Sequence, residues 1–273
     1  MEIHELGDLE LRPGRLTLWR ANVPHPATWR ADPRRPSRIQ KEHLCWFGNG
    51  RPAWLGVAFE WSGEIDTKAL SRAIFGWVYR HEALRCRFVK HGSTIHLATA
   101  DRGVATLDLI ELGDYADSGE LTRIVEELFD TETNPLRSPA YLFVTIRRPG
   151  STTAVLASDH SVTDAFSMAS VPFEIKEFYA AAIQGAVPRL ALAHSYLDYA
   201  VSKRARVTNL TDEHPAIGHW RELIAANGGE LPDFPVPLDA VGGALQLTSR
   251  TWHFDAETAR RSIERVVPNA EMP

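Results

Sequence analysis

Residues 152–164 of the chain read TTAVLASDHSVTD. The first half, through Ala157, is an apolar run with the length and content of a buried strand. This strand continues directly into a polar loop that carries Asp159, His160 and Asp164. A histidine at the end of a buried strand is held by rigid backbone, and its near-neutral imidazole can take a proton from a hydroxyl or an amine. The stretch therefore predicts a sheet and, at its edge, a candidate general base.

The residues by themselves leave a second interpretation of His160 open. The chain contains 11 histidines, so a histidine beside an aspartate in a loop can also be structural or simply exposed. Other groups of residues give weaker evidence for a functional site. His214 and His219 lack a third metal ligand. The sequence has neither a Gly-x-Ser-x-Gly elbow nor a phosphate-binding glycine loop, which disfavours serine-hydrolase and nucleotide-dependent chemistry.

The segments around this stretch form an α/β pattern. An apolar strand at 141–146 precedes it across the turn Arg147-Arg148-Pro149-Gly150, and a helical pattern follows over 166–183, with Pro172 predicted near its start. Other candidate strands lie at 9–12, 53–61, 84–88, 94–98, 106–110 and 246–254, and other candidate helices at 66–82, 121–129, 195–203, 216–226 and 255–266. Elements mixed without strict alternation favour a layered α/β sandwich over a barrel.

Composition narrows the class of protein. Among 273 residues, 30 Lys and Arg against 35 Asp and Glu give a formal net charge of −5, which disfavours a nucleic-acid-binding protein. Two cysteines, Cys45 and Cys86, exclude a disulfide scaffold, and the apolar neighbours of Cys45 predict a buried, inert thiol. No apolar run reaches the ~20 residues of a membrane helix, and the first residues do not resemble a signal peptide. We therefore expect a reduced, cytoplasmic protein.

The first 52 residues contain few clear elements. Prolines at positions 24, 26, 33 and 36 interrupt regular structure, so we expect an irregular N-terminal segment over 1–52. The basic stretch from Arg30 to Lys41 has two interpretations. It could contact the phosphates of a cofactor or a membrane surface, or it could be a solvated loop stiffened by proline. The lack of interleaved aromatic residues favours the loop.

Several motifs occur in a characteristic order along the chain. They are Gly63-Glu64-Ile65-Asp66, Arg80-His81-Glu82-Ala83-Leu84-Arg85, Asn134-Pro135-Leu136, Asp159-His160-Ser161-Val162-Thr163-Asp164, Glu174-Ile175 and Ser195-Tyr196-Leu197-Asp198-Tyr199-Ala200. Between about 53 and 254, their order and spacing resemble the condensation-domain superfamily, which includes the polyketide-associated (Pap) acyltransferases. The resemblance implies the fold of chloramphenicol acetyltransferase: a two-layer α/β sandwich with a mixed β-sheet flanked by helices.

The polar loop departs from the family pattern His-His-x-x-x-Asp-Gly at two positions. Asp159 replaces the first histidine and Ala165 replaces the glycine. The Asp-His pair is more similar to the Pap branch, which esterifies hydroxyls during lipid and glycolipid assembly, than to the peptide-forming domains. If the backbone at Ala165 needs φ > 0, its Cβ costs about 1 kcal/mol or more.

The resemblance also implies roles for the loop residues. The acyl donor would be acyl-CoA or an acyl-phosphopantetheine carrier protein, used as a co-substrate, with no permanently bound cofactor and no metal. His160 would accept the proton of a hydroxyl (or amine) acceptor as that group attacks the thioester. Asp164 would pair with Arg85 on the neighbouring strand and keep the loop under His160 in place, and Asp159 would support the same site.

Members of this family have two similar lobes with a tunnel between them. By resemblance, 53–226 forms the N-terminal lobe, 227–245 a linker and 246–273 the start of a truncated C-terminal lobe, because the family's Asp-Phe-Gly-Trp-Gly motif is absent. The chain would then be a fragment, a split enzyme that needs a second lobe or partner chain, or a lobe with a binding role.

The alternative functions are an amide-forming condensation domain of nonribosomal peptide synthesis and a non-catalytic lobe that docks a carrier protein. An α/β domain in which His160 has no catalytic role is a further possibility. We expect the chain to have no nucleic-acid partner and no transmembrane segment.

Overall fold

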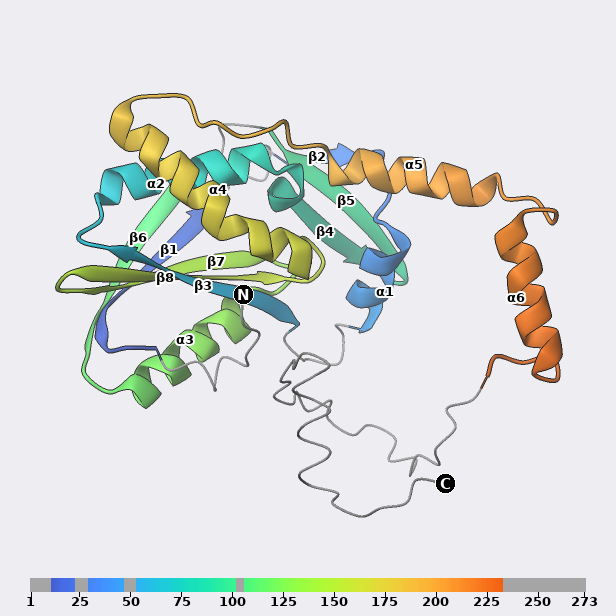
Figure 1. Ribbon diagram of the computed structural model, residues 1–273, viewed down its shortest axis with the longest axis horizontal. Coiled ribbons are helices and arrows are strands. Elements are labelled where there is room, and N and C mark those ends of the chain that lie inside the picture. Colours follow the sequence, from blue (N-terminus) through green and yellow to red (C-terminus); the bar gives the residue numbers. More distant parts are fainter. Residues whose placement is uncertain (1–10, 23–28, 47–52, 102–105, 233–273) are drawn as a thin grey trace, which may run out of the picture.

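The structure is a computed structural model that describes residues 11–22, 29–46, 53–101 and 106–232 (Figure 1). The strands are β1 (Gly14–Asn22), β2 (Trp29–Asp32), β3 (Trp54–Ser62), β4 (Cys86–His91), β5 (Thr94–Ala100), β6 (Thr106–Tyr115), β7 (Tyr141–Arg148) and β8 (Ser151–Asp159). The helices are α1 (Arg38–Trp46), α2 (Thr67–Arg80), α3 (Ser118–Glu132), α4 (Ala165–Gln184), α5 (Tyr196–Thr208) and α6 (Pro215–Ala226), with a 3₁₀ helix η4 (Glu82–Arg85). The expected strand 246–254, helix 255–266 and second-lobe segment 246–273, and most of the linker 227–245, lie outside the described residues.

Strand β8, which ends in the candidate motif, lies inside a sheet with the order β3-β8-β7-β1-β6. Leu156 of β8 is opposite Val57 of β3 on one side and Phe143 of β7 on the other. Every neighbouring pair in this sheet is antiparallel, which corrects the mixed sheet expected from the sequence. The connection explains one of these pairs: β7 and β8 form a tight hairpin through Gly150, at φ 78°, whereas a parallel pair needs a long crossover.

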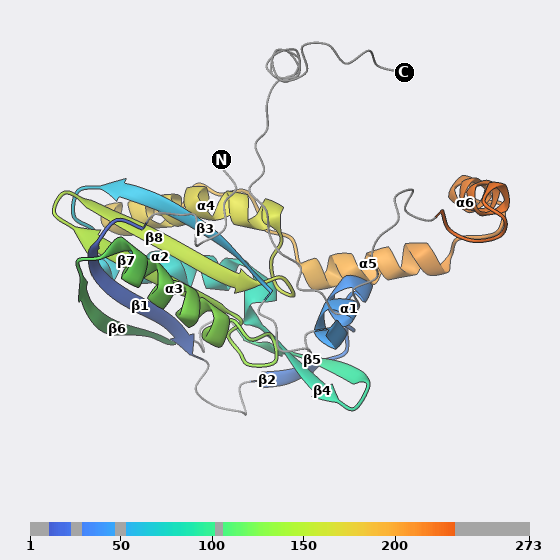
Figure 2. The same ribbon diagram turned by 90° about the horizontal axis from the view of Figure 1, so that it is seen from below.

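Helices cover both faces of this sheet (Figure 2). Phe143 and Leu156 pack with α2 and α4 on one face, whereas Leu142 and Val155 pack with α3 on the other. Side chains alternate between the faces of a strand, so covering both faces buries successive residues. This is why β8 is a continuous apolar run in the sequence. The expected α/β class, with a sheet flanked by helices, is confirmed.

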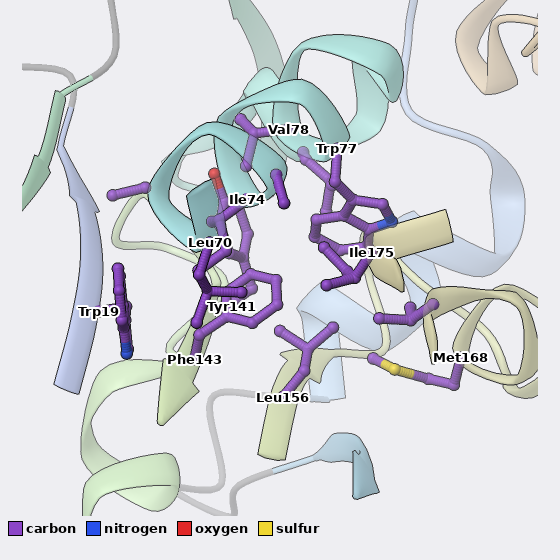
Figure 3. Close-up of a cluster of buried hydrophobic side chains, with 14 residues drawn as sticks. Trp19, Leu70, Ile74, Trp77, Val78, Tyr141, Phe143, Leu156, Met168 and Ile175 are labelled. Atoms are coloured by element: carbon purple, nitrogen blue, oxygen red, sulfur yellow. The ribbon is translucent and has the colours of Figure 1, made fainter. Parts of the chain in front are cut away.

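The face under α2 and α4 is filled by large side chains (Figure 3). The Trp77 ring of α2 packs edge-on against Tyr141 and Phe143 of β7, with ring centroids 6.2 and 5.4 Å apart. Met168 and Ile175 of α4 belong to the same cluster. The two helices are therefore fixed relative to the sheet by one shared core.

The segment after the motif forms one helix that continues through Pro172. Asp164 Oδ1 accepts from the Ser167 backbone N–H at 2.7 Å and starts α4 at Ala165, so the expected start near Pro172 is wrong. Proline has no N–H to donate within the helix. The burial of Val171 and Ile175 on the sheet side keeps the backbone helical across it.

The N-terminal segment contains a central strand. β1 lies between β7 and β6, and Leu16, Leu18 and Trp19 are at most 2% exposed. The Trp19 indole N–H donates to Thr145 Oγ1 at 2.9 Å. The irregular segment expected over 1–52 is therefore wrong where β1, β2 and α1 lie. Leu16 and Leu18 pack in the cluster with α3 and Trp19 packs in the cluster with α2 and α4, so both faces of β1 are covered.

A second sheet, of order β2-β5-β4, supports the end of the molecule where β8 finishes. Leu97 of β5 packs with Leu44 of α1 and Leu197 of α5 in a separate buried cluster. Val162, in the loop after β8, packs against this cluster and against the main core. The loop that carries the candidate motif is thus held between two cores.

Arg34 joins three elements of this region. Its guanidinium contacts Asp32 of β2 at 2.7 Å, Glu82 of η4 at 2.8 Å and Asp198 of α5 at 2.8 Å. These hydrogen bonds, the one to Asp32 above all, raise the pKa of Arg34 above its ordinary value. The solvated-loop interpretation of the basic stretch is therefore wrong at Arg34, which acts as a structural tie.

The two cysteines differ from expectation in one respect. Cys86 is buried, and burial raises the pKa of its thiol to about 12. Cys45 is exposed, so the buried thiol expected from its apolar neighbours is wrong. Cys45 lies on α1 directly after the fully buried Leu44, and successive helix positions point about 100° apart.

Helices α5 and α6 extend away from the main sheet (Figure 1). α5 buries Leu197 and Ala200 in its first turns, whereas no residue of α6 is buried. Trp220 of α6 is 52% exposed. The apolar side of α6 therefore makes no core contact in the described part of the chain.

The close approach of α2 and α4 generates a test of this packing. A Cβ at Gly76 of α2 would lie 2.5 Å from Phe178 Cδ1 of α4. Gly76→Ala should lower the free energy of unfolding by about 1–3 kcal/mol through overpacking, although alanine is the better helix former. Chemical denaturation of purified protein measures the change.

The matched control is Gly218→Ala on α6, where a Cβ meets nothing within 4 Å. It should leave stability unchanged or raise it, by up to about 1 kcal/mol from helix propensity. Equal stability of the two variants would contradict the α2–α4 packing.

Candidate active site

The end of β8 opens into a pocket of about 400 Å³. Residues from α1, α2, η4, the loop after β8, α4 and the segment before α5 line it, among them His81, His160, Ser161 and His194. The motif after β8, where the sequence predicts the site, forms part of this lining. Pockets of this size, with apolar walls and a few polar groups, are typical ligand sites.

His160 lines this pocket and has an exposed side chain. Its backbone N–H donates to the Ala53 carbonyl at 3.0 Å, which fixes the main chain. Its ring Nδ1 lies 2.8 Å from the Thr163 carbonyl oxygen. A carbonyl only accepts, so Nδ1 carries the hydrogen, and Nε2 of the neutral ring is left with its lone pair. The geometry therefore selects the tautomer that a general base needs.

Asp159, directly before His160, is fully buried. Its Oδ1 accepts from the Ser161 backbone N–H at 2.8 Å. His43 Nε2, from α1, lies 3.0 Å from Oδ1 and 3.2 Å from Oδ2. The rings of His43 and His160 meet edge-on, with centroids 6.0 Å apart. The structure thus places Asp159 next to the candidate base, as the sequence predicts, with a partner that the sequence did not reveal.

Helix α1 reaches the loop at a second point. Gln40 Nε2 donates to the Ser161 carbonyl at 2.8 Å. Sequence reasoning missed both Gln40 and His43 because the prolines suggested an irregular segment. A signal was present: Ser37 and Gln40 form a capping box, with Ser37 Oγ accepting from Gln40 N and Gln40 Oε1 accepting from Ser37 N.

Asp164 has a different role from the one expected. Its carboxylate accepts from Ser167 N and Ser167 Oγ, each at 2.7 Å, and caps α4. These bonds, together with nearby His160, hold the pKa of Asp164 below its ordinary value. The expected pair with Arg85 is replaced by this cap, because the carboxylate turns toward the exposed backbone N–H groups at the start of α4.

Arg85 is buried at the junction of η4 and β4. Its Nη1 donates to the Ala100 carbonyl of β5 at 2.7 Å. Arg85 therefore holds the second sheet against the end of α2 and η4. It supports the region around the pocket through backbone rather than through Asp164.

Ala165 is the first residue of α4, and no non-glycine residue in the described ranges has a positive φ. The strain considered for alanine at this position does not arise.

His81 also lines the pocket. His81 Nε2 lies 2.5 Å from Glu174 Oε2, and Arg80 Nε donates to Glu174 Oε1 at 2.9 Å. Burial alone would raise the pKa of Glu174, but hydrogen bonds from His81 and Arg80 outweigh it and lower the pKa. Glu174 is therefore an ionised tie between α2 and α4 rather than a proton donor.

Two buried polar atoms in pocket-lining residues have no hydrogen-bond partner in the described structure. They are the indole Nε1 of Trp77 and the hydroxyl of Ser161. Buried donors normally find a partner, since leaving one unpaired costs about 1–3 kcal/mol. Both atoms are themselves buried, so a molecule in the pocket would meet either donor only after its side chain turns toward the cavity.

Comparison with known proteins identifies the family of this chain. The family model "Condensation domain" matches residues 53–265, which is most of the chain. The chain belongs to the condensation-domain family.

Among curated relatives, the chain is 30% identical over 230 residues to a dimodular nonribosomal peptide synthase of Bacillus subtilis, covering 78% of this chain and 9% of that protein. It is 26% identical over 184 residues to acyltransferase PapA3 of Mycobacterium tuberculosis, covering 67% and 38%. It is 24% identical over 249 residues to 2'-acyl-2-O-sulfo-trehalose (hydroxy)phthioceranyltransferase PapA1 of Mycobacterium bovis, covering 87% and 48%. The chain spans less than half the length of each of these relatives.

Solved structures agree on the fold. PapA2 acyl transferase superposes with a TM-score of 0.74 at 23% identity, covering 87% of this chain and 53% of that one. The X-domain from teicoplanin biosynthesis gives 0.58 at 20% identity, covering 71% and 44%. The fold expected from the resemblance is therefore confirmed.

The described residues lack two kinds of feature. None of the helices there combines the length and hydropathy needed to span a bilayer. The same residues contain no group of three or more His, Cys, Asp or Glu side chains placed to hold a metal ion.

The cap geometry predicts how Asp164 contributes to stability. Asp164→Ala should lower the free energy of unfolding by about 0.5–2 kcal/mol, because α4 loses its N-cap. The pKa of Asp164 is lowered in the folded state. Its charged form therefore contributes fully to the free energy of unfolding above about pH 4, and this contribution is lost as the pH falls through the folded-state pKa. Urea denaturation of both proteins at pH values from 3 to 7 measures the loss of stability and its pH dependence. This range includes the ordinary Asp pKa of about 3.9.

Asp164→Asn is the matched variant, because asparagine also caps helices. It should keep most of the stability at pH 7 and show no loss on acidification from this position. Equal losses in the alanine and asparagine variants would indicate a charge pair instead of a cap.

Proposed function

We propose that this chain carries the catalytic half of an acyltransferase, with His160 as the general base. The observation that carries the proposal is the Nδ1 contact to the Thr163 carbonyl, which leaves Nε2 as the available lone pair on a residue that lines the pocket. Membership of the condensation-domain family and similarity to PapA1 and PapA3 support acyl transfer as the reaction.

The proposed step transfers an acyl group from sulfur to oxygen. The acceptor hydroxyl gives its proton to His160 Nε2 while its oxygen attacks the thioester carbonyl carbon. The tetrahedral intermediate then expels the thiolate as the C–S bond breaks. The Nε2 proton passes to the departing sulfur, which yields the ester and a free thiol and restores the neutral ring.

The polar atoms without partners fit this step. The carbonyl oxygen gains negative charge in the intermediate, and a prearranged donor lowers that barrier. Ser161 is adjacent to His160, and its hydroxyl is unpaired. We assign Ser161 Oγ as the candidate donor to this oxygen, which it would reach by rotating about the Cα–Cβ bond out of its buried position. Trp77 Nε1 is a second donor for a carbonyl of the bound donor or acceptor.

The acyl donor in this proposal is a phosphopantetheine thioester, on CoA or on a carrier protein, used as a co-substrate. Because the chain spans about half of PapA1 and of PapA2, the complete reaction is proposed to involve a second lobe, from the same protein or from a partner chain. The acceptor is proposed to be a hydroxyl compound in lipid, polyketide or related natural-product biosynthesis. The cytoplasmic location stays a prediction.

Two alternatives have specific support. The relative with 30% identity is a nonribosomal peptide synthase, which favours an amine acceptor and amide formation. A fold relative has been solved as a complex of the X-domain and OxyB from teicoplanin biosynthesis, with a TM-score of 0.56. That complex favours a non-catalytic docking lobe, although the intact His160 geometry favours catalysis.

Intact-mass measurement of acyl transfer tests the proposal. The full chain is incubated with acyl-CoA or an acyl carrier protein and a panel of alcohols and amines, with and without a separately supplied Pap second lobe. His160→Ala should lower transfer by about 10²–10⁴-fold, the usual contribution of a general base. Because the side chain is exposed, the variant should keep the wild-type melting temperature.

His91→Ala, which removes another exposed histidine at the end of β4 and outside the pocket, is the control and should transfer normally. Near-wild-type turnover in the His160 variant would exclude the base assignment. Carrier binding without transfer in any arm would favour the docking lobe, and amine products alone would favour amide formation.

A second test concerns Ser161. Removing an unpaired buried hydroxyl costs no hydrogen bond, so Ser161→Ala should leave the melting temperature unchanged or raise it. If Ser161 Oγ stabilises the developing negative charge, kcat should fall by roughly 10²-fold or more with little change in KM.

Ser170→Ala is the matched control for this test. Ser170 lines the same pocket, but its hydroxyl already donates to the Ser167 carbonyl at 2.8 Å. It should retain the wild-type rate. Equal rates for both variants would refute the assignment of Ser161.

A further inference from the structure

His43 is a titratable group beside the pocket that the proposed reaction does not use. It projects from α1, and its side chain is 19% exposed. Its Nε2 faces both oxygens of Asp159, at 3.0 and 3.2 Å. A carboxylate only accepts, so His43 Nε2 carries a hydrogen and donates it to Asp159.

Asp159 needs this donor. Its side chain is 1% exposed, and an ionised carboxylate without partners is among the most costly groups to bury. Among the described residues, its hydrogen-bond donors are Ser161 N and His43 Nε2. Removing His43 would leave Oδ2 without a donor in the described structure.

The satisfied carboxylate fixes the backbone on both sides of His160. Asp159 precedes the base, its N–H donates to the Ala140 carbonyl at 2.8 Å, and its carboxylate holds the N–H of Ser161, the residue after the base. Thr163, whose carbonyl fixes the His160 ring, donates its Oγ1 hydrogen to the Asp159 carbonyl at 3.3 Å. The position and tautomer of His160 thus depend on a loop closed around Asp159.

His43 itself is rigidly placed. The next residue, Leu44, is fully buried in the core of the second sheet. Gln40, one turn earlier, is 4% exposed and donates to the Ser161 carbonyl at 2.8 Å. α1 therefore holds the loop at two points on one helix face, and His43 supplies the hydrogen bond to the buried carboxylate.

We infer that His43 is a positioning residue for His160, acting through the buried Asp159 carboxylate. The inference rests on the proposed role of His160 as base. In this chain an aspartate stands before the base, and His43 supplies the hydrogen that its burial requires. His43 contacts neither acyl donor nor acceptor in this assignment, and it acts on the rate only by holding the loop.

The first test needs no enzymatic activity. Long-range ¹H–¹⁵N NMR of the full chain, labelled with ¹⁵N, distinguishes protonated from bare ring nitrogens. Wild-type protein at neutral pH should show His160 protonated at Nδ1 and bare at Nε2, with His43 protonated at Nε2. His43→Leu should give His160 a mixture of tautomers, whereas His43→Gln, which keeps an N–H donor, should retain the wild-type pattern.

The second test is kinetic. In the acyl-transfer assay, His43→Leu should lower kcat by on the order of 10- to 100-fold with KM little changed, since a small misplacement of a catalytic group costs this much. His43→Gln should recover most of the loss. In an Asp159→Asn background, His43→Leu should cost much less, because its effect passes through the carboxylate.

The outcomes separate this inference from the proposed function. An unchanged His160 tautomer in His43→Leu, or an equal kcat loss with and without Asp159, would overturn the positioning role while leaving acyl transfer intact. Absence of transfer in wild-type protein would overturn the proposed function, and the NMR test would still decide the role of His43. If His43→Leu does not fold, the wild-type spectrum and His43→Gln decide the question. A bare His43 Nε2 in the wild-type protein overturns the inference. A protonated Nε2, together with the wild-type His160 tautomer in His43→Gln, supports it.

Discussion

The burial of one carboxylate organises the candidate site. Asp159 is the last residue of β8 and is fully buried, so its charge needs donors from nearby elements. Ser161 supplies one from the loop and His43 another from α1. These contacts draw α1 and the loop onto the end of the sheet, and they bring His160 into the lining of a pocket. The geometry of the candidate site is therefore a consequence of how a buried carboxylate is satisfied.

The elements that supply these contacts are held by two separate cores. The main sheet is covered by α2 and α4 on one face and by α3 on the other, which keeps β8 rigid. α1 and α5 pack on the second sheet through Leu44 and Leu197. Arg34 ties β2, η4 and α5 together through three carboxylates. The pocket lies where these two units meet, so its shape depends on both.

Local sequence predicted the parts of the fold with strong patterns. The strands β7 and β8, the helix after Asp66 and the position of the candidate base followed from apolar runs, a capping residue and a polar loop. β1 was missed because the prolines after it suggested an irregular segment, although Leu16, Thr17 and Leu18 alternate. α1 was not predicted because the prolines around Ser37 suggested irregular structure, although Ser37 and Gln40 form a capping box. The role of Asp164 could not be read from spacing, since one aspartate can cap a helix or pair with a distant arginine.

The sequence by itself determined the α/β class, the family resemblance and the candidate base, because each depends on residues adjacent or regularly spaced along the chain. The tertiary structure decided the antiparallel order of the sheet, the partner of Asp159 and the tautomer of His160. His43 and Asp159 are 116 positions apart. No local pattern encodes such a contact, since it forms only when two cores, folded from different parts of the chain, bring α1 against the end of β8.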